Sequence, residues 1–143
     1  MKVMTTELAK TIVTQLNRRF VYRADTWRWV DNWRIMQTPN GTGVLVGDCE
    51  DYSLTLAFAL SERSWLCFWW GIFTFRFVIW HCRWNDEGHA VMWVRGEGWV
   101  DNIQQRFTDT RPFYMRRGLR FPFLPPYVVL KMALAAICRR VWS

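Results

Sequence analysis

The sequence predicts an α+β fold in which helices pack on a small antiparallel sheet. One observation is an amphipathic pattern near the start of the chain, and a second is a long apolar segment that begins at Cys49. A third is a set of short runs rich in β-branched and aromatic residues, separated by turn residues. Since 51% of the 143 residues are apolar, the chain can build its own core and is not a disordered segment.

We predict a single domain over residues 1–143, with its core at about 5–105. The first helix is expected over residues 5–19, where apolar side chains recur at helical spacing. The Trp-rich stretch that follows, at 23–36, has two interpretations. It is either a short helix capped near Asp25 or an extended segment, and a Pro- and Gly-containing loop comes after it.

The second helix is predicted to run from Cys49 to about Arg63. Gly47 provides a tight turn before it, and Asp48 is a suitable N-cap residue. Acidic residues in the first turn favour this start because they complement the helix dipole. The helix is apolar on most sides, so we expect it to lie at the centre of the domain.

Three strands are expected after this helix. We read Gly71 as a turn, and then predict a strand over residues 72–83, which is rich in Phe, Val, Ile and Trp. The second strand is predicted from His89 to Val94, and its partner from Trp99 to Gln104. The two are expected to form a hairpin.

The hairpin spacing predicts a contact between His89 and Asp101. A three-residue loop over Val94-Arg95-Gly96 is a favoured connection, and it pairs these two residues directly across the ladder. Opposed side chains on one face of a sheet lie about 5 Å apart at Cβ. The imidazole and the carboxylate would then be within reach of each other.

The C-terminal part of the chain is expected to be irregular up to residue 123 and helical at about 125–142. Pro125 and Pro126 suit a helix start, and the following residues are apolar on nearly all sides. We interpret this extension as a buried or partner-facing helix, with a membrane-surface helix as the alternative. No segment is predicted to span a membrane.

The composition limits the classes of partner. The net charge is +7, but the arginines are scattered and form no run typical of a nucleic-acid-binding arm. We therefore expect no specific nucleic-acid partner. The 11 tryptophans and 10 phenylalanines indicate either a core rich in large side chains or a groove for peptide, sugar or a partner chain. Cysteines 67, 82 and 138 are expected to be small buried side chains.

Cys49, His89 and Asp101 are the parts of a nucleophilic triad. A thiolate at a helix N-terminus is favoured by the helix dipole, an imidazole can accept its proton, and a carboxylate can orient that imidazole. A lone Cys or His in such places is more often a packed structural side chain. The three together, in a register that brings two of them into contact, favour acyl transfer from an amide.

The motifs around these residues resemble a known family. They are Gly-Asp-Cys-Glu-Asp-Tyr at 47–52, Gly-His-Ala-Val at 88–91 and Trp-Val-Asp-Asn at 99–102, with weaker likeness at Asn17, Tyr22, Trp33 and Thr38-Pro39. The likeness covers roughly residues 10–105, and the family is the bacterial transglutaminase-like cysteine peptidases, of the papain/transglutaminase superfamily. This resemblance implies a papain/transglutaminase-like fold and proteolysis.

Two features of the site stay open at this point. The backbone N–H of Cys49 is one natural oxyanion donor, and Trp33, Gln37 and Asn40 are candidates for the second. The carboxylates beside the thiol raise its pKa, and a bound cation would reverse that effect. Since members of the resembled family include calcium-dependent peptidases, Asp48 and Glu50 are candidate calcium ligands, unless they only cap the helix.

The first hypothesis is therefore a cysteine peptidase or amidase that acts on a polypeptide substrate through a thioester. The alternative is a structural or binding protein that keeps the fold without needing the chemistry and contacts a partner protein. Small members of the resembled family occur in bacteriophages, and this compact Trp-rich chain looks like one. No secretory signal is apparent, so we expect the bacterial host cytoplasm or a phage virion.

Overall fold

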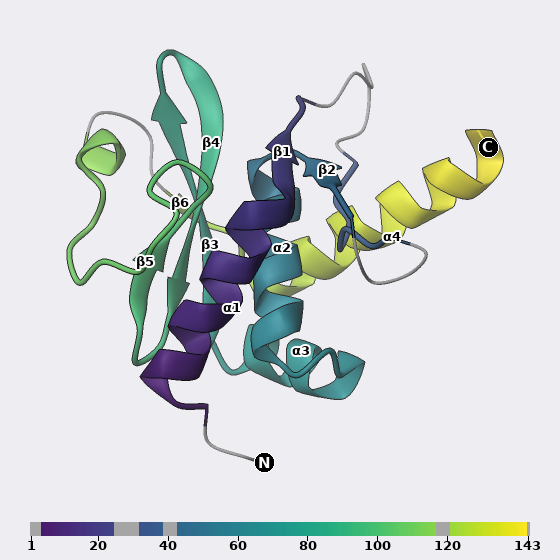
Figure 1. The fold of residues 1–143 in the computed structure, drawn as a ribbon. Helices are drawn as coiled ribbons and strands as arrows, with labels where there is room; N and C mark the ends of the chain where they lie inside the picture. The colour runs from purple at the N-terminus through teal and green to yellow at the C-terminus, as the bar shows by residue number, and fades with distance from the viewer. Residues whose placement is uncertain (1–3, 25–31, 39–42, 117–120, 143) are drawn as a thin grey trace.

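The computed structural model describes residues 4–24, 32–38, 43–116 and 121–142. These residues form an α+β structure with four α-helices and a four-stranded antiparallel sheet of order β5-β4-β3-β6 (Figure 1). The helices are α1 (Thr6–Arg19), α2 (Cys49–Leu60), α3 (Trp65–Phe73) and α4 (Pro125–Trp142). The strands of the sheet are β3 (Phe77–Trp84), β4 (Glu87–Val94), β5 (Gly98–Val100) and β6 (Phe121–Pro122). The predicted α+β class with a small antiparallel sheet is confirmed.

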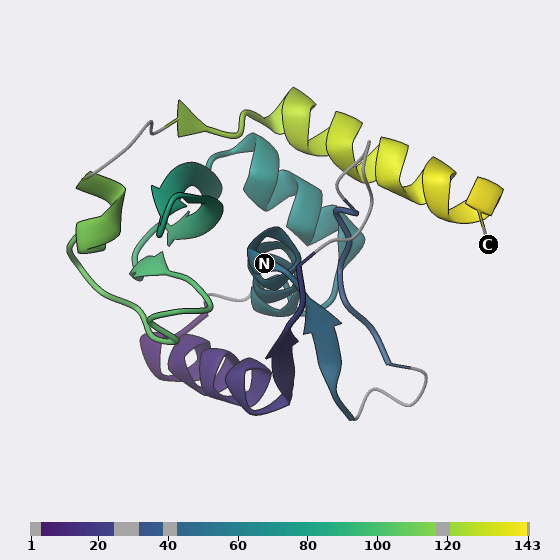
Figure 2. The same cartoon turned by 90° about the horizontal axis from the view of Figure 1, so that it is seen from above.

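Helix α2 lies at the centre of the structure, as its sequence predicts. Viewed from above, α1 lies on one side of it, the sheet on another and α4 beyond it (Figure 2). Almost every residue of α2 is buried. The helix ends at Leu60, three residues before the predicted end, because Glu62 and Arg63 take positive φ angles of 55° and 59° that no α-helix allows.

The predicted strand over residues 72–83 is wrong in its first part. Residues 72 and 73 belong to helix α3, residues 74–76 form a turn, and β3 begins at Phe77. Ser64 caps this helix by accepting a hydrogen bond from the amide of Cys67 at 3.3 Å. Gly71 is not a turn but lies inside α3, where an added Cβ would come within 2.4 Å of the Phe77 ring. Its missing side chain therefore lets the start of β3 pack closely against the helix.

The hairpin between β4 and β5 differs in register from the prediction by two residues. The observed pairs are Met92 with Val100 and Val94 with Gly98, because the loop takes residues 95–97. If this register is continued past Val100, Asp101 lies opposite Val91 and diagonal to His89. A shift of two residues keeps every side chain on its predicted face, so the imidazole and the carboxylate still lie on one side of the sheet.

The two faces of the sheet carry different clusters. One face packs against α2 and α3 and contributes Ile79, Ala90, Met92 and Val100 to the main core. The other carries a smaller cluster of Cys82, Val91, Trp99, Tyr114 and Met115, closed by the 3₁₀-helix η1 (Phe113–Arg116). His89 pairs with Cys82 across the ladder and therefore belongs to this second face.

A second, parallel pair of strands was not predicted. Strand β1 (Phe20–Tyr22) lies beside β2 (Leu45–Gly47), with Tyr22 opposite Gly47. This pair brings the chain directly into the N-cap of α2. Of the Trp-rich stretch, residues 25–31 lie outside the described residues, and residues 32–38 are irregular.

Helix α4 begins at Pro125, and its C-terminal end extends away from the sheet (Figure 1). Val128 and Ala135 are buried, whereas Leu130, Ile137 and Val141 are exposed. The helix thus covers part of the core and leaves an apolar face uncovered by the described residues. None of the helices in the described ranges has the length and apolar character needed to cross a bilayer.

Candidate active site

His89 and Asp101 form a buried hydrogen-bonded pair. The distance from His89 Nε2 to Asp101 Oδ2 is 2.7 Å, and neither side chain is open to solvent. Asp101 Oδ1 also accepts the amides of Ile103 at 3.1 Å and Gln104 at 2.7 Å. The Asp101 carboxylate is thereby fixed, and it in turn fixes the orientation of the imidazole.

The same two amide contacts explain why β5 is shorter than predicted. By binding the amides two and three residues ahead, the Asp101 side chain forms a turn at 102–104 in place of further strand pairing. The predicted strand to Gln104 is therefore wrong after Val100. β5 covers only residues 92–94 of its neighbour, so the amide of Ala90 is left for another acceptor.

That acceptor is the sulfur of Cys49. The amide of Ala90 donates to Cys49 Sγ at 3.3 Å, so the thiol meets β4 one residue from His89. Cys49 is the first residue of α2, and Asp48 caps that helix in a capping box with Asp51. Local sequence thus sets where the helix begins, and the short β5 sets where its first side chain can reach the sheet.

The thiol is held in a protonated resting arrangement. Cys49 Sγ donates to Glu50 Oε2 at 2.9 Å, and only 4% of the residue is exposed. Burial, the negative charge of Glu50, the hydrogen bond to Glu50 and the charge of Asp48 together raise the pKa of Cys49 well above its ordinary value. The predicted effect of the flanking carboxylates is confirmed in direction, with burial as the larger cause.

The structure therefore brings together two of the three predicted residues and places the third beside them. Asp101 occupies Nε2 of His89, so Nδ1 is the ring nitrogen left to face a thiol. The thiol is bonded to Glu50 and to the Ala90 amide.

The candidate oxyanion donors fall in three different places. Arg34 N donates to the Asp51 carboxylate at 3.0 Å, which sets Trp33 level with the first turn of α2. The Trp33 indole N–H is buried and has no hydrogen-bond partner among the described residues. Gln37 lines a pocket of about 270 Å³ beside Thr55 and Phe58, at the far half of α2 from Cys49. Asn40 lies outside the described residues.

The two candidate calcium ligands both have protein partners. Asp48 accepts the amide of Asp51 at 3.0 Å, and Glu50 accepts the thiol of Cys49. Calcium takes about six to eight oxygen ligands, and the described ranges hold no group of three or more His, Cys, Asp or Glu placed to bind a metal.

Calcium binding at Asp48 and Glu50 stays a prediction with a direct test. If calcium joins these carboxylates, an excess of chelator lowers the melting temperature relative to an excess of calcium, because a ligand of the native state stabilises it. Differential scanning fluorimetry in the two buffers measures the difference. Equal melting temperatures would remove the metal from this site.

Three further hydrogen bonds involve residues whose roles the sequence did not predict. Tyr52 of α2 donates to Asn17 Oδ1 at 2.5 Å, and Asn17 Nδ2 donates to the backbone oxygen of Gln105 at 2.7 Å. Asn17 of α1 thereby ties the helix that carries Cys49 to the turn that carries Asp101. Tyr114 of η1 donates to Asp101 Oδ2, the same oxygen that contacts His89.

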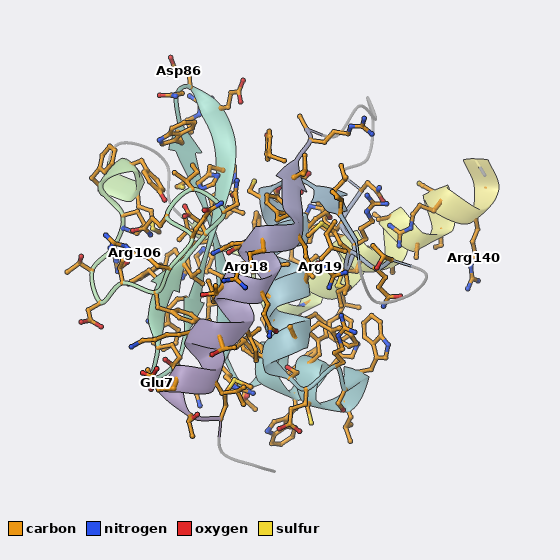
Figure 3. The ribbon with its side chains drawn as sticks, in the orientation of Figure 1. Glu7, Arg18, Arg19, Asp86, Arg106 and Arg140 are labelled. Carbon is orange, nitrogen blue, oxygen red and sulfur yellow. The ribbon has the colours of Figure 1, made fainter. Side chains whose placement is uncertain are left out.

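The arginines labelled in Figure 3 lie on separate elements of the structure. Arg18 and Arg19 project from α1, Arg106 from the segment after β5 and Arg140 from the outer end of α4, on opposite sides of the view (Figure 3). A stripe of basic side chains is the usual footprint of a nucleic-acid-binding surface. The labelled arginines do not form one.

No protein-family model matches the sequence, and no curated protein is significantly similar to it.

Proposed function

We propose that this chain is a cysteine peptidase or amidase of the transglutaminase-like class, with a papain/transglutaminase-like arrangement of helix and sheet. Cys49 is the nucleophile, His89 the general base and acid, and Asp101 the residue that orients His89. The observation that carries the proposal is the buried 2.7 Å contact between His89 and Asp101, at the point where the first residue of α2 reaches β4.

The first half of the reaction forms a thioester. The Cys49 thiol leaves Glu50 and gives its proton to His89 Nδ1, and the sulfur attacks the carbonyl carbon of the amide. The carbonyl oxygen becomes an oxyanion. The imidazolium then gives its proton to the amide nitrogen, the C–N bond breaks, and the amine product leaves while the acyl group stays on sulfur.

The second half hydrolyses the thioester. Water loses a proton to His89 and adds to the acyl carbon, and the C–S bond of the resulting intermediate breaks. The proton returns from the imidazolium to sulfur, and the product is a carboxylic acid. Asp101 keeps its charge throughout and stabilises the imidazolium that forms in each half.

Stabilisation of the oxyanion requires donors that are already in place. The N–H groups of the first turn of a helix have no partner within it, so the Cys49 amide is the first donor. Trp33 is our candidate for the second donor, because its indole N–H is buried and has no hydrogen-bond partner within the described ranges.

Selective alkylation tests the proposal. We expect iodoacetamide to label Cys49 before Cys67 and Cys138, because transfer of the Cys49 proton to His89 outweighs the raised pKa of the resting thiol. Peptide mass spectrometry over a time course at fixed pH measures the order of labelling. Cys67 and Cys138 are more exposed than Cys49, so labelling that followed access alone would reach them first. Preference for the more buried thiol therefore reports chemical activation by His89.

Two variants complete this experiment. His89→Gln should remove the preference while leaving the slower labelling of Cys67 unchanged. Cys49→Ala supplies the background of the other cysteines. If wild-type Cys49 reacts no faster than Cys67, the proposed nucleophile is wrong.

A second candidate function has its own supporting observation. The outer faces of α3 and α4 expose large apolar side chains, among them Leu66 at 81%, Trp70 at 60% and Ile137 at 57%. Such faces are typical of surfaces that bind another chain. Together with a thiol sealed by Glu50, they support a structural or binding protein, such as a virion component, that does not need the chemistry.

Cys49→Ala separates the two functions. A peptidase loses its activity in this variant, whereas a structural component keeps its assembly with its partner chain, measured by size-exclusion chromatography of the co-expressed pair. Unchanged assembly together with an unreactive wild-type Cys49 would favour the second function over the first.

A further inference from the structure

We propose that Tyr114 is a positioning residue of this site, whose hydroxyl shares Asp101 Oδ2 with His89 and so sets how strongly the carboxylate holds the imidazole proton. The consequence for catalysis rests on the proposed function. The competition between two donors for one oxygen holds whether or not the chain is an enzyme.

The contacts of Tyr114 place its hydroxyl inside the pair. The O–H donates to Asp101 Oδ2, and His89 Nε2 contacts the same oxygen at 2.7 Å. The Tyr114 ring meets the His89 ring edge to face, with centroids 5.5 Å apart and an angle of 76° between the planes. Tyr114 therefore touches both members of the pair and is 5% exposed.

The segment that carries Tyr114 is itself anchored. In η1 the amide of Met115 donates to Pro112 O at 3.0 Å, and Met115 is buried in the cluster on the second face of the sheet. Trp84 closes the other side of the Tyr114 ring, at 6.5 Å between centroids. Because a phenylalanine ring would make the same apolar contacts, the hydroxyl is what distinguishes tyrosine at this position.

The hydroxyl stays a donor over the working pH range. Burial, the hydrogen bond to Asp101 and the charge of Asp101 raise the pKa of Tyr114 far above its ordinary value. The phenol is therefore protonated throughout the range in which an imidazole titrates. It donates to Asp101 whether His89 is neutral or charged.

The expected effect on His89 follows from this constant donation. Each hydrogen bond to a carboxylate oxygen neutralises part of its charge, and charge-assisted bonds are the strongest of these. By donating to Oδ2, Tyr114 weakens the attraction of Asp101 for a protonated imidazole. His89 then releases its proton more readily to the leaving amine and to the thiolate.

Other titratable groups lie around His89, and any charge on them also acts on its imidazole. Asp101 lies beside it, Tyr114 of η1 packs on its ring, Cys82 of β3 is directly opposite, and Cys49 of α2 bonds the next amide. Burial and the charge of Asp101 raise the pKa of Cys82 to about 11. Cys82 is therefore neutral at pH 7, and its state does not change with the Tyr114 hydroxyl.

The test is an NMR titration of His89 in Tyr114→Phe. The chain has two histidines, so His81→Gln in every sample leaves a single imidazole signal to follow. We expect the pH midpoint of this signal to rise in Tyr114→Phe by about one, a gain of about tenfold in proton affinity. Tyr127→Phe, a change on α4, is the matched control and should leave the midpoint unchanged.

An unchanged or lower midpoint in folded Tyr114→Phe would overturn the proposal. If that variant does not fold, 3-fluorotyrosine placed at 114 alone keeps the ring and makes the phenol a stronger donor. The midpoint should then fall, and a value equal to wild type or above it would overturn the proposal instead. Iodoacetamide labelling of wild-type Cys49 tests the proposed function separately, so the two failures are distinguishable.

Discussion

Asp101→Asn is expected to slow both the alkylation of Cys49 and any amide hydrolysis by about 10²–10⁴-fold. The aspartate accepts hydrogen bonds from His89 and Tyr114 at one oxygen and from two amides at the other. An asparagine has one acceptor oxygen and one NH₂ group, so one of these sets loses its acceptor. The imidazole then loses both its orientation and the charge that stabilises its protonated form.

The measurement is the second-order rate of iodoacetamide labelling at Cys49, followed by mass spectrometry. Asp109→Asn is the matched control, because Asp109 follows in the same irregular segment and is exposed. It should label at the wild-type rate. Circular dichroism and melting temperature show whether Asp101→Asn remains folded, and an unchanged rate in the folded variant would exclude Asp101 from the chemistry.

Glu50→Gln is expected to have the opposite effect, a faster alkylation of Cys49 at neutral pH. After burial, the charge of Glu50 and its hydrogen bond are the largest causes of the raised pKa of Cys49. Removing that charge lowers the pKa, so a larger fraction of the thiol is ionised at pH 7. The pH midpoint of alkylation should move down, while burial and Asp48 keep it above the ordinary value for a thiol.

The pH profile of alkylation between pH 6 and 10 measures this change. Glu62→Gln, just beyond the other end of α2, removes the same charge far from the thiol and should leave the profile unchanged. A slower reaction in Glu50→Gln would contradict our account of the resting thiol. It would show that Glu50 assists the reaction instead of holding the proton on sulfur.

The parts of the site that local sequence determines could be predicted. The start of α2 at Cys49 follows from Asp48 and Asp51, whose capping contacts span three residues. The contact between His89 and Asp101 was predicted with a register that is wrong by two residues. The contact is still present because side chains alternate between the two faces of a strand, so a register shift of two residues leaves each side chain on the same face.

The parts that depend on tertiary packing could not be predicted. The run from Trp65 to Phe73 has high strand propensity but forms α3, where Phe68 packs on Phe58 of α2. The contact between Tyr114 and Asp101 joins an irregular segment to a turn, and that between Asn17 and Gln105 joins residues 88 positions apart. Neither leaves a periodic pattern in the sequence.

The bridge through Asn17 makes reactivity conditional on completed folding. Helix α2 carries Cys49, and Asp101 lies just before a turn that is distant in sequence. Asn17 of α1 contacts both, through Tyr52 of α2 and the backbone oxygen of Gln105. A molecule in which α1 has locally unfolded still has the side chains of Cys49, His89 and Asp101, but they are no longer held in fixed relative positions. A newly made or partly unfolded chain would then lack the arrangement that the proposed chemistry needs.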